Sequence, residues 1–287
     1  MSRSVYVNGR YVAHGDAVVH VEDRGFQLSD GVYEVWAVMD GRLADAEGHF
    51  ARLERSLNEL RIEPPMSRAA LEVVVRETVR RNRVRNGLVY LQVTRGAARR
   101  DHAFPSPEVP PTLVVSARSI DMAAAEVRAA KGVGVITTPE NRWGRCDIKT
   151  IGLLPNVLAR QAAKEADGYE AWFVDDDGMI TEGAASNAWI IDKEGTLRTR
   201  ELTANILRGV TRTSLLSVIA ESNIRFEEGP FSVADAKQAR EAFITGAGAL
   251  ILPVVSIDGE PVGDGGAGEV SLRLRRDYIQ RAREGAA

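Results

Sequence analysis

One lysine of this chain lies at the border between a polar segment and an apolar one. Lys149 is followed by the run Ile151-Gly152-Leu153-Leu154, and the segment before it is polar. Such a lysine is often a surface residue whose aliphatic stem packs on apolar neighbours while its amine stays in water. The alternative is a partly desolvated amine that forms a Schiff base with an aldehyde. The local sequence alone favours the surface interpretation.

The second interpretation needs an aldehyde, which pyridoxal 5'-phosphate (PLP) would supply. That cofactor makes three further demands on a protein. A carboxylate must keep the pyridine nitrogen protonated. Backbone amides, a hydroxyl and an arginine must hold the phosphate. Polar groups must orient the carboxylate of the substrate.

The chain offers candidates for the first two demands. Glu182 follows a predicted strand and precedes small residues that would let a flat ring approach the backbone. Val210 and Thr211 open a predicted helix, and the exposed amides and positive dipole at such a helix end favour phosphate. Arg52 could add a permanent positive charge.

The third demand is matched by a polar loop, GAARRDHAFPSPEVPP, in which Arg100 and His102 can both bind a carboxylate. Taken singly, each candidate has a structural role that is at least as good. Glu182 or Thr211 could cap a helix, and Arg52 could be a surface arginine. The candidates gain weight only as a set.

The elements that must position these residues begin with strands followed by helices. The turn Asn8-Gly9 predicts a hairpin, because both turn positions require positive φ. Apolar residues at three- and four-residue spacing predict a helix over 50–60, and Ser67 is placed to cap a second helix. The predicted strands of this part lie at 5–7, 11–12, 32–39, 87–94 and 112–117.

After about residue 120 shorter strands alternate with helices. Strands are predicted at 133–138, 171–174 and 188–191, and helices at 155–166 and 210–220. The change of pattern places a domain boundary near Ile120 to Ala125. We therefore expect a mixed α/β chain with a smaller N-terminal domain at 1–120 and a larger C-terminal domain at 121–287, which carries the lysine.

Composition argues against several classes of function. The 37 basic and 40 acidic residues of the 287-residue chain nearly cancel, which disfavours a protein that mainly binds nucleic acid or an anionic membrane. The single cysteine cannot form an internal disulfide, and the four histidines lack the spacing of a metal site. The N-terminus lacks the apolar stretch of a signal peptide, and the most apolar segment, 249–257, is too short to cross a bilayer. We expect a cytoplasmic protein without a metal.

Together the candidate segments resemble the class IV, or fold type IV, PLP-dependent aminotransferases. The resemblance runs along most of the chain in six ordered blocks, which are EDRGFQLSDGVYEV (22–35), HFARL (49–53), VYLQVTRGAARRDHAFP (89–105), RCDIKTIGLLPNVLA (145–159), TEGAASN (181–187) and ILRGVTR (206–212). Within the family the sequence is most similar to D-amino-acid aminotransferases, because Arg100-x-His102 and Tyr33 resemble the group that binds the substrate carboxylate there. The resemblance implies an N-terminal α/β sandwich and a C-terminal α/β pseudo-barrel, with PLP in the cleft between them.

The resemblance also implies a role for each site residue. Lys149 would carry PLP and move the proton between the substrate α-carbon and the cofactor, and Glu182 would pair with the pyridinium nitrogen. The residues assigned to the cofactor are Arg52, Lys149, Glu182, Leu207, Val210, Thr211 and Ala247, and those assigned to the substrate carboxylate are Tyr33, Arg100 and His102. In the family the Arg-x-His loop reaches the neighbouring subunit, which implies a homodimer.

Some positions depart from the family pattern. Ala184 and Ala185 stand where D-amino-acid aminotransferases often have serines. The turn Gly246-Ala247-Gly248 replaces a hydroxyl-rich turn near the phosphate. We therefore expect fewer hydrogen bonds to the cofactor than in a hydroxyl-rich relative.

The expected reaction is transamination of a D-amino acid to a 2-oxo acid, with a 2-oxo acid acceptor such as 2-oxoglutarate or pyruvate. Side activity on (R)-amines would follow if the loop arginine swings away. The alternatives on the same fold are a branched-chain L-amino-acid aminotransferase, against which the Arg-x-His pair argues, and an aminodeoxychorismate lyase, which releases pyruvate. A PLP-binding or scaffold protein without activity would have lost the lysine or the acid, and both are present.

Overall fold

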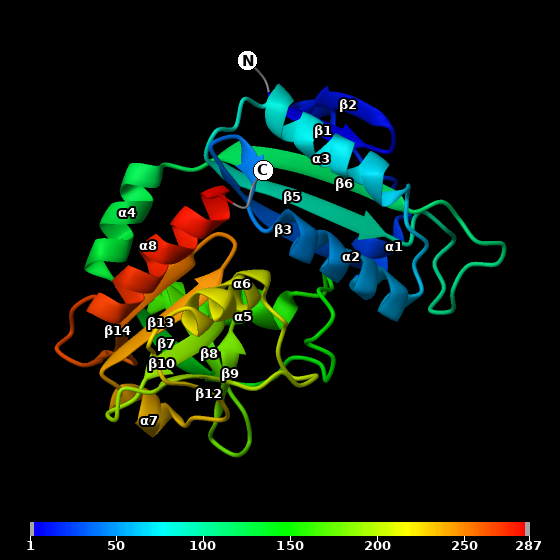
Figure 1. Ribbon diagram of the computed structural model, residues 1–287. Helices are drawn as coiled ribbons and strands as arrows, with labels where there is room; N and C mark the ends of the chain where they lie inside the picture. The colour runs from blue at the N-terminus through cyan, green and yellow to red at the C-terminus, as the bar shows by residue number, and fades with distance from the viewer. Residues whose placement is uncertain (1–2, 285–287) are drawn as a thin grey trace. The chain divides into compact units, whose positions relative to one another are not determined.

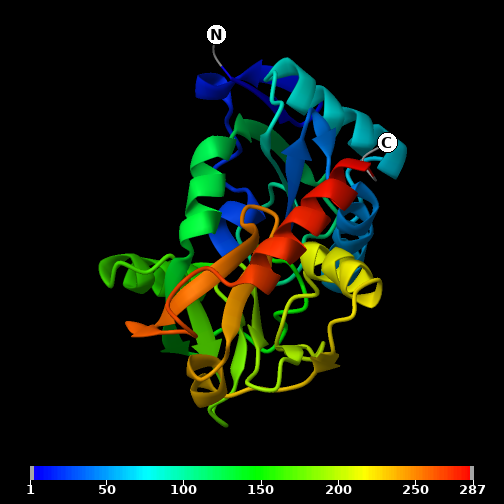
Figure 2. The ribbon, with the colours of Figure 1, turned by 60° about the vertical axis from the view of Figure 1, so that its left-hand side comes forward.

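The computed structural model describes residues 3–284, which form two compact units. Unit 1 contains residues 3–121, 148–152 and 283–284, and unit 2 contains Met122–Asp147 and Leu153–Ala282. Figures 1 and 2 show the elements of both units in two views. Five residues from beyond the expected boundary, 148–152, thus belong to the N-terminal unit.

Unit 1 is built on an antiparallel sheet of six strands in the order β2-β1-β6-β5-β3-β4. The expected hairpin is confirmed, since β1 and β2 are joined by Asn8 and Gly9 with φ of 44° and 92°. The strands are β1 Ser4–Val7, β2 Arg10–Ala13, β3 Gly31–Met39, β4 Arg42–Leu43, β5 Gly87–Thr94 and β6 Thr112–Ser119. The helices are η1 His14–Asp16, α1 Arg24–Leu28, α2 Ala46–Leu60 and α3 Arg68–Arg81.

Helices α2 and α3 cover one face of this sheet (Figure 1). Alternate residues of β3 point to opposite faces, and its even-numbered apolar residues, Val32, Trp36 and Val38, lie in the core with apolar side chains from both helices. Ser67 caps α3 as expected, by accepting a hydrogen bond from the amide of Ala70. The odd-numbered residues of β3 therefore lie on the face without helices.

The segment 148–152 extends this sheet beside the first residues of β3. Val32 and Thr150 form an antiparallel bridge, and the amide of Tyr33 donates to the carbonyl of Lys149 at 3.0 Å. Ile148 is buried in the core on the helix side. Because side chains alternate along an extended segment, Lys149 lies on the opposite side, which is the face of Tyr33.

Unit 2 is built on a nine-stranded mixed sheet in the order β12-β11-β10-β13-β14-β7-β8-β9, with β15 paired to β14. Strand β7 runs parallel to β8 and β14, and β11 runs parallel to β12. Although β9 and β10 are distant in this order, they lie against each other, so the sheet curls on itself. The sequence expectation of a mixed α/β fold with a curled C-terminal sheet is confirmed.

The strands of unit 2 are β7 Val133–Pro139, β8 Glu170–Val174, β9 Ile180–Gly183, β10 Asn187–Ile191, β11 Leu197–Thr199, β12 Phe226–Glu228, β13 Glu241–Gly246, β14 Leu250–Ile257 and β15 Glu260–Pro261. Its helices are α4 Met122–Lys131, α5 Leu154–Glu165, α6 Val210–Ala220, α7 Val233–Lys237 and most of α8 Glu269–Glu284. Within residues 3–284 no helix has the length and apolar character needed to span a membrane.

Two valines on α3 test the packing of unit 1. Val75 is 0% exposed and lies in the core, whereas Val73 on the same helix is 65% exposed. We expect Val75→Ala to lower the free energy of unfolding by about 2 kcal/mol, because it removes two buried methyl groups and leaves a cavity. Val73→Ala is the matched control and should leave stability nearly unchanged. Equal denaturant midpoints for the two variants would contradict this packing.

Candidate active site

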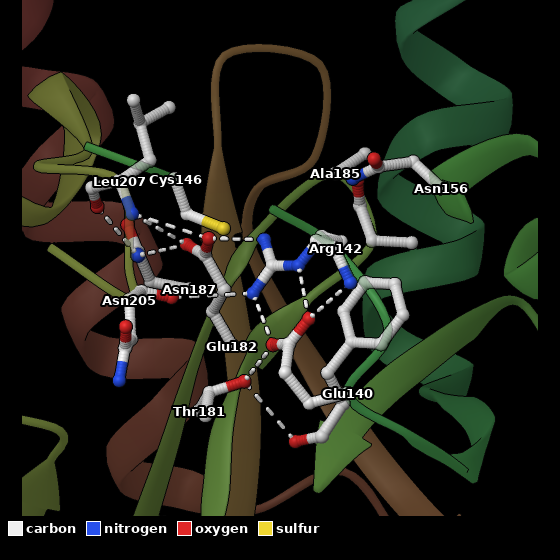
Figure 3. Close-up of polar contacts among 12 residues, drawn as sticks. Glu140, Arg142, Cys146, Asn156, Thr181, Glu182, Ala185, Asn187, Asn205 and Leu207 are labelled. Carbon is white, nitrogen blue, oxygen red and sulfur yellow. Dashed lines mark hydrogen bonds and ion pairs between the residues drawn. The ribbon is translucent and has the colours of Figure 1, made fainter. Parts of the chain in front are cut away.

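The carboxylate of Glu182 is the centre of the polar cluster in unit 2 (Figure 3). The main-chain amide of Leu207 donates to both carboxylate oxygens at 3.1 Å, and the side-chain amide of Asn187 donates to one of them at 3.0 Å. The guanidinium of Arg142 donates to the other at 2.6 Å. Glu182 is buried, so these donors offset the loss of water around its charge.

The strand context of Glu182 differs from the sequence expectation. Glu182 is the third residue of β9 and does not follow a strand. All four residues of β9 are buried, so the segment lacks the polar alternation that marks a half-buried strand. The small residues after Glu182 form the turn into β10, where the amide of Gly183 donates to the carbonyl of Ser186 at 2.7 Å.

Arg142 was not among the sequence candidates, and it bridges two acids. Its guanidinium donates to both oxygens of Glu140 at 2.8 and 2.6 Å as well as to Glu182. Burial opposes the ionisation of Glu140, but the hydrogen bonds and charge of Arg142 hold the pKa of Glu140 below its ordinary value. The arginine stands seven residues before Lys149. The only signal in the sequence that could have identified Arg142 as a site residue is its position just before the block 145–159.

Cys146 lies in the same cluster. Its thiol donates to the carbonyl of Trp143 at 3.2 Å, and burial raises the pKa of Cys146 to about 11. The thiol is therefore protonated at neutral pH and is a poor nucleophile.

The N-terminus of α6 has the features of an anion site. The helix begins at Val210, as expected, and its N-cap is Gly209, which has no side chain to cap the first amides. A Cβ at Gly209 would lie 2.0 Å from Oδ1 of Asn187, so no larger residue fits. Val210 and Thr211 are buried. The uncapped amides of this turn suit a phosphate.

The other cofactor residues of unit 2 lie in segments next to these. Leu207 contacts Glu182 through its amide and precedes α6 by three residues. Ala247 is half-buried in the turn between β13 and β14, and a Cβ at Gly246 would lie 3.1 Å from the carbonyl oxygen of Ala185. Unit 2 therefore brings together the Glu182 cluster, Leu207 and the start of α6. The turn between β13 and β14, which contains Ala247, lies beside the segment that follows Glu182.

The amine of Lys149 lies over an aromatic ring in unit 1. Its Nζ is 4.2 Å from the ring centroid of Tyr33, which stacks on Tyr90 with ring centroids 5.7 Å apart. Burial raises the pKa of Tyr90 to about 12, and its hydroxyl donates to Gln92 at 2.6 Å. The main chain of Lys149 is fixed by strand pairing, while its side chain is half-buried. The structure thus brings Tyr33 and Lys149 together.

Arg52 is held by a buried carboxylate. The guanidinium of Arg52, on α2, donates to both oxygens of Glu34 at 2.7 and 2.8 Å, and Nδ1 of His49 lies 2.8 Å from the same carboxylate. Glu34 is completely buried on the helix-covered face of β3. Burial alone would raise its pKa, but Arg52 and His49 lower the pKa of Glu34 to about 2. Burial lowers the pKa of His49, so its imidazole is neutral at pH 7.

Arg100 and His102 lie on the loop between β5 and β6, and both are exposed. The adjoining main-chain carbonyls of Asp101 and His102 accept hydrogen bonds from Arg24 at 2.6 and 3.4 Å. Unit 1 therefore carries four of the expected side chains, Tyr33, Arg52, Arg100 and His102, as well as Lys149. Within the described part of the chain, no group of three or more His, Cys, Asp or Glu side chains could hold a metal ion.

Comparison with known proteins places the chain in a family. The sequence model of Amino-transferase class IV matches residues 31–257. D-alanine aminotransferase of Staphylococcus haemolyticus is 38% identical over 275 residues, which are 96% of each chain, and that of Bacillus licheniformis is 38% identical over 94% of each chain. The chain belongs to the class IV aminotransferase family.

Solved structures agree with this assignment. A T.th. branched-chain amino acid aminotransferase with pyridoxamine 5'-phosphate superposes with a TM-score of 0.90 at 26% identity, covering 98% of this chain and 94% of the other. The Escherichia coli branched-chain amino acid aminotransferase has a TM-score of 0.89 at 24% identity with the same coverage, which shows a shared fold.

The buried Glu34–Arg52 pair has a testable acid dependence. The pKa of Glu34 is lowered from 4.5 to about 2 on folding, so the stability it contributes is complete above about pH 4.5 and is lost as the pH falls toward 2. Glu34→Gln should remove this part of the acid sensitivity. At pH 7 it should cost about 3–5 kcal/mol, because it removes the carboxylate that balances the buried charge of Arg52.

The control for this pair is Glu47→Gln. Glu47 pairs with Arg68, but its side chain is 82% exposed. In urea titrations from pH 3 to pH 7, the free energy of unfolding of Glu47→Gln should stay close to that of wild type at each pH. The same pH dependence in wild type and Glu34→Gln would refute a stabilising role of the Glu34 charge.

Proposed function

We propose that this protein is a PLP-dependent aminotransferase of D-amino acids. The observation that carries the proposal is the arrangement in unit 2, where a buried carboxylate held by Arg142 precedes an uncapped helix start along the same chain. The D-alanine aminotransferases of two genera, which match over 94–96% of this chain, support the choice of D-amino acids.

The residues present fit PLP. Glu182 is an acceptor for the pyridine N–H, and its position is fixed by three donors. Val210 and Thr211 offer amides and a hydroxyl to the phosphate, because no side chain caps the helix at Gly209. Arg52 would add its charge to the phosphate, Leu207 and Ala247 would border the cofactor, and Lys149 would hold it covalently. When bound, PLP supplies a ring that takes up the electron pair of the broken Cα–H bond.

The chain's own residues then divide the work of the reaction. Lys149 would take the proton from the substrate α-carbon and pass it to the cofactor, and it would move a proton in the opposite direction when the acceptor reacts. The ring of Tyr33 lies against the amine of Lys149, so the lysine is close to this part of the carboxylate-binding group. Tyr33, Arg100 and His102 would bind the substrate α-carboxylate and so direct the α-hydrogen of a D-amino acid toward Lys149. The acceptor would be a 2-oxo acid such as 2-oxoglutarate or pyruvate, and the enzyme would work in the cytoplasm.

Two other reactions would use the same fold. The branched-chain aminotransferases among the solved structures share the architecture, but the Arg100-x-His102 loop argues for a D-amino acid. An aminodeoxychorismate lyase would use the same lysine to release pyruvate. Activity on (R)-amines would be secondary, since such substrates lack the carboxylate that the loop binds.

Absorbance titration of the PLP-loaded enzyme tests the reaction. D-alanine should convert the bound cofactor to its amino form and release pyruvate in equal amounts, whereas L-alanine should react much more slowly. Lys149→Ala should abolish both the reaction and the absorbance of lysine-bound PLP. Faster reaction with L-alanine or L-leucine would refute the D-specificity and leave the cofactor assignment intact. Continuous pyruvate release from aminodeoxychorismate, without the amino form, would identify a lyase.

We also propose a homodimer in which the Arg100–His102 loop reaches the neighbouring active site. Supporting evidence comes from an exposed apolar segment in unit 1, where Val18, Val21 and Phe26 are 75%, 68% and 73% exposed. Surfaces of this kind are unusual on a protein that stays monomeric.

Sedimentation equilibrium tests the assembly. Wild type should have about twice the chain mass of 31.3 kDa. A double variant, Val21→Asp with Phe26→Asp, should sediment as a monomer because it puts two charges into the contact. Val73→Asp changes an equally exposed valine on α3 and should stay dimeric. A monomeric wild type, or a dimeric double variant, would contradict this interface.

A further inference from the structure

The loop that carries Arg100 and His102 is exposed, yet a buried arginine lies directly beneath its main chain. Arg24, the first residue of α1, is only 3% exposed. Its guanidinium donates to the carbonyl of Asp101 at 2.6 Å and to that of His102 at 3.4 Å. The carbonyl of Asp101 lies between Arg100 and His102 in the main chain, and the second carbonyl belongs to His102 itself.

Arg24 is itself fixed by a carboxylate that it shares with a second arginine. Asp30 accepts from Nε of Arg24 at 2.8 Å and from Nε of Arg95 at 2.7 Å, and both guanidinium groups are nearly buried. Arg95 also donates to the carbonyls of Leu60 and Arg61, at the end of α2. One carboxylate therefore ties two cations to the framework of unit 1.

Arg95 holds the same loop at another point. Its guanidinium carbon lies 3.6 Å from the ring centroid of Phe104, and that of Arg61 lies 4.8 Å away. A turn closes the part between the two anchors, since Oδ1 of Asp101 accepts from the amide of Ala103 at 3.1 Å. The loop is thus attached at 101–102 through Arg24 and at 104 through Arg95. Asp30 accepts hydrogen bonds from both of these arginines.

We propose that Arg24 and Asp30 are positioning residues for the binding of the substrate carboxylate. Arg24 does not touch substrate in this scheme. It fixes the main chain from which Arg100 and His102 project, and so holds their side chains where a carboxylate would be bound. This inference rests on the proposed function, because it concerns the loop to which that proposal assigns the carboxylate.

The test compares Arg24→Met with Arg275→Met. Arg275 is a matched control in unit 2, since it is also 3% exposed and donates to one carboxylate, Glu126, and to two main-chain carbonyls, those of Ala249 and Ile251. Loss of a buried arginine destabilises both variants. Only Arg24→Met should raise the KM for D-alanine, by about tenfold or more, while kcat and the amount of bound PLP change little.

A second measurement does not require activity. Trypsin cleaves after arginine, so the rate of cleavage after Arg99 reports how often the loop leaves its anchors. In the PLP-loaded enzyme, Arg24→Met and Asp30→Asn should be cleaved there several times faster than wild type, and Arg275→Met at the wild-type rate. Arg24→Lys keeps one donor group for Asp30 and should lie in between.

The outcomes separate this inference from the proposed function. If wild type converts D-alanine and Arg24→Met raises KM no more than Arg275→Met does, the positioning role is wrong and the proposed function stands. If wild type does not react with D-amino acids, the proposed function fails, and the trypsin rates alone then decide whether Arg24 anchors the loop. If Arg24→Met does not fold, unchanged KM and cleavage in both Arg24→Lys and Asp30→Asn overturn the inference.

Discussion

The pairing of a buried carboxylate with a guanidinium is the interaction on which the rest of this structure depends. Glu182 is held by Arg142 in unit 2, and Glu34 is paired with Arg52 in unit 1. A buried charge without a partner would cost several kcal/mol, so each pair fixes two side chains at once. The groups expected to meet the ring nitrogen and the phosphate are therefore set in place before any ligand binds, and preorganised charges of this kind need little rearrangement during a reaction.

The same logic explains how the near-neutral net charge of -3 is compatible with anionic ligands. The buried arginines of unit 1 are accompanied by acids that determine where they point. Glu34 holds Arg52, which would face the phosphate, and Asp30 holds Arg24 and Arg95, which support the loop of Arg100 and His102. The acids lower the net charge, but they bind the arginines on the side away from the expected ligands. Cationic groups or amides are therefore left at the places where phosphate and carboxylate would bind.

Much of the fold could be predicted from local sequence. Asn8-Gly9 marks a hairpin because few residues accept positive φ, and Ser67 marks a helix start because its hydroxyl replaces a missing partner for an amide. The start of α6 at Val210 agrees with the prediction, whereas α2 begins at Ala46, four residues before the predicted helix. The candidate side chains, Lys149 and Glu182 among them, could be proposed only as a set and through the resemblance to a known family, because each alone also fits a structural role.

Other features depend on contacts between distant parts of the chain, which have no local pattern. Thr150 pairs with Val32 across 118 residues (150 − 32), so nothing near Lys149 indicates that it belongs to the sheet of unit 1. Arg142 looks like any other arginine of a polar segment, and its importance comes from the two acids that meet it. Strand β9 is buried on both faces, so its sequence does not alternate and the place of Glu182 within it was missed.

The membership of residues 148–152 in unit 1 bears on how such a protein could be assembled from parts. The chain leaves unit 2 after Asp147 and returns to it at Leu153, so unit 1 is not a continuous stretch of sequence. A fragment ending at residue 121 would lack the segment beside β3, and with it the lysine. Recombination at the apparent boundary would likewise join a sheet from one parent to a lysine segment from another. The lysine expected to carry the cofactor is thus encoded within the sequence of one unit and folded with the other, so exchange of either unit alone would change its surroundings.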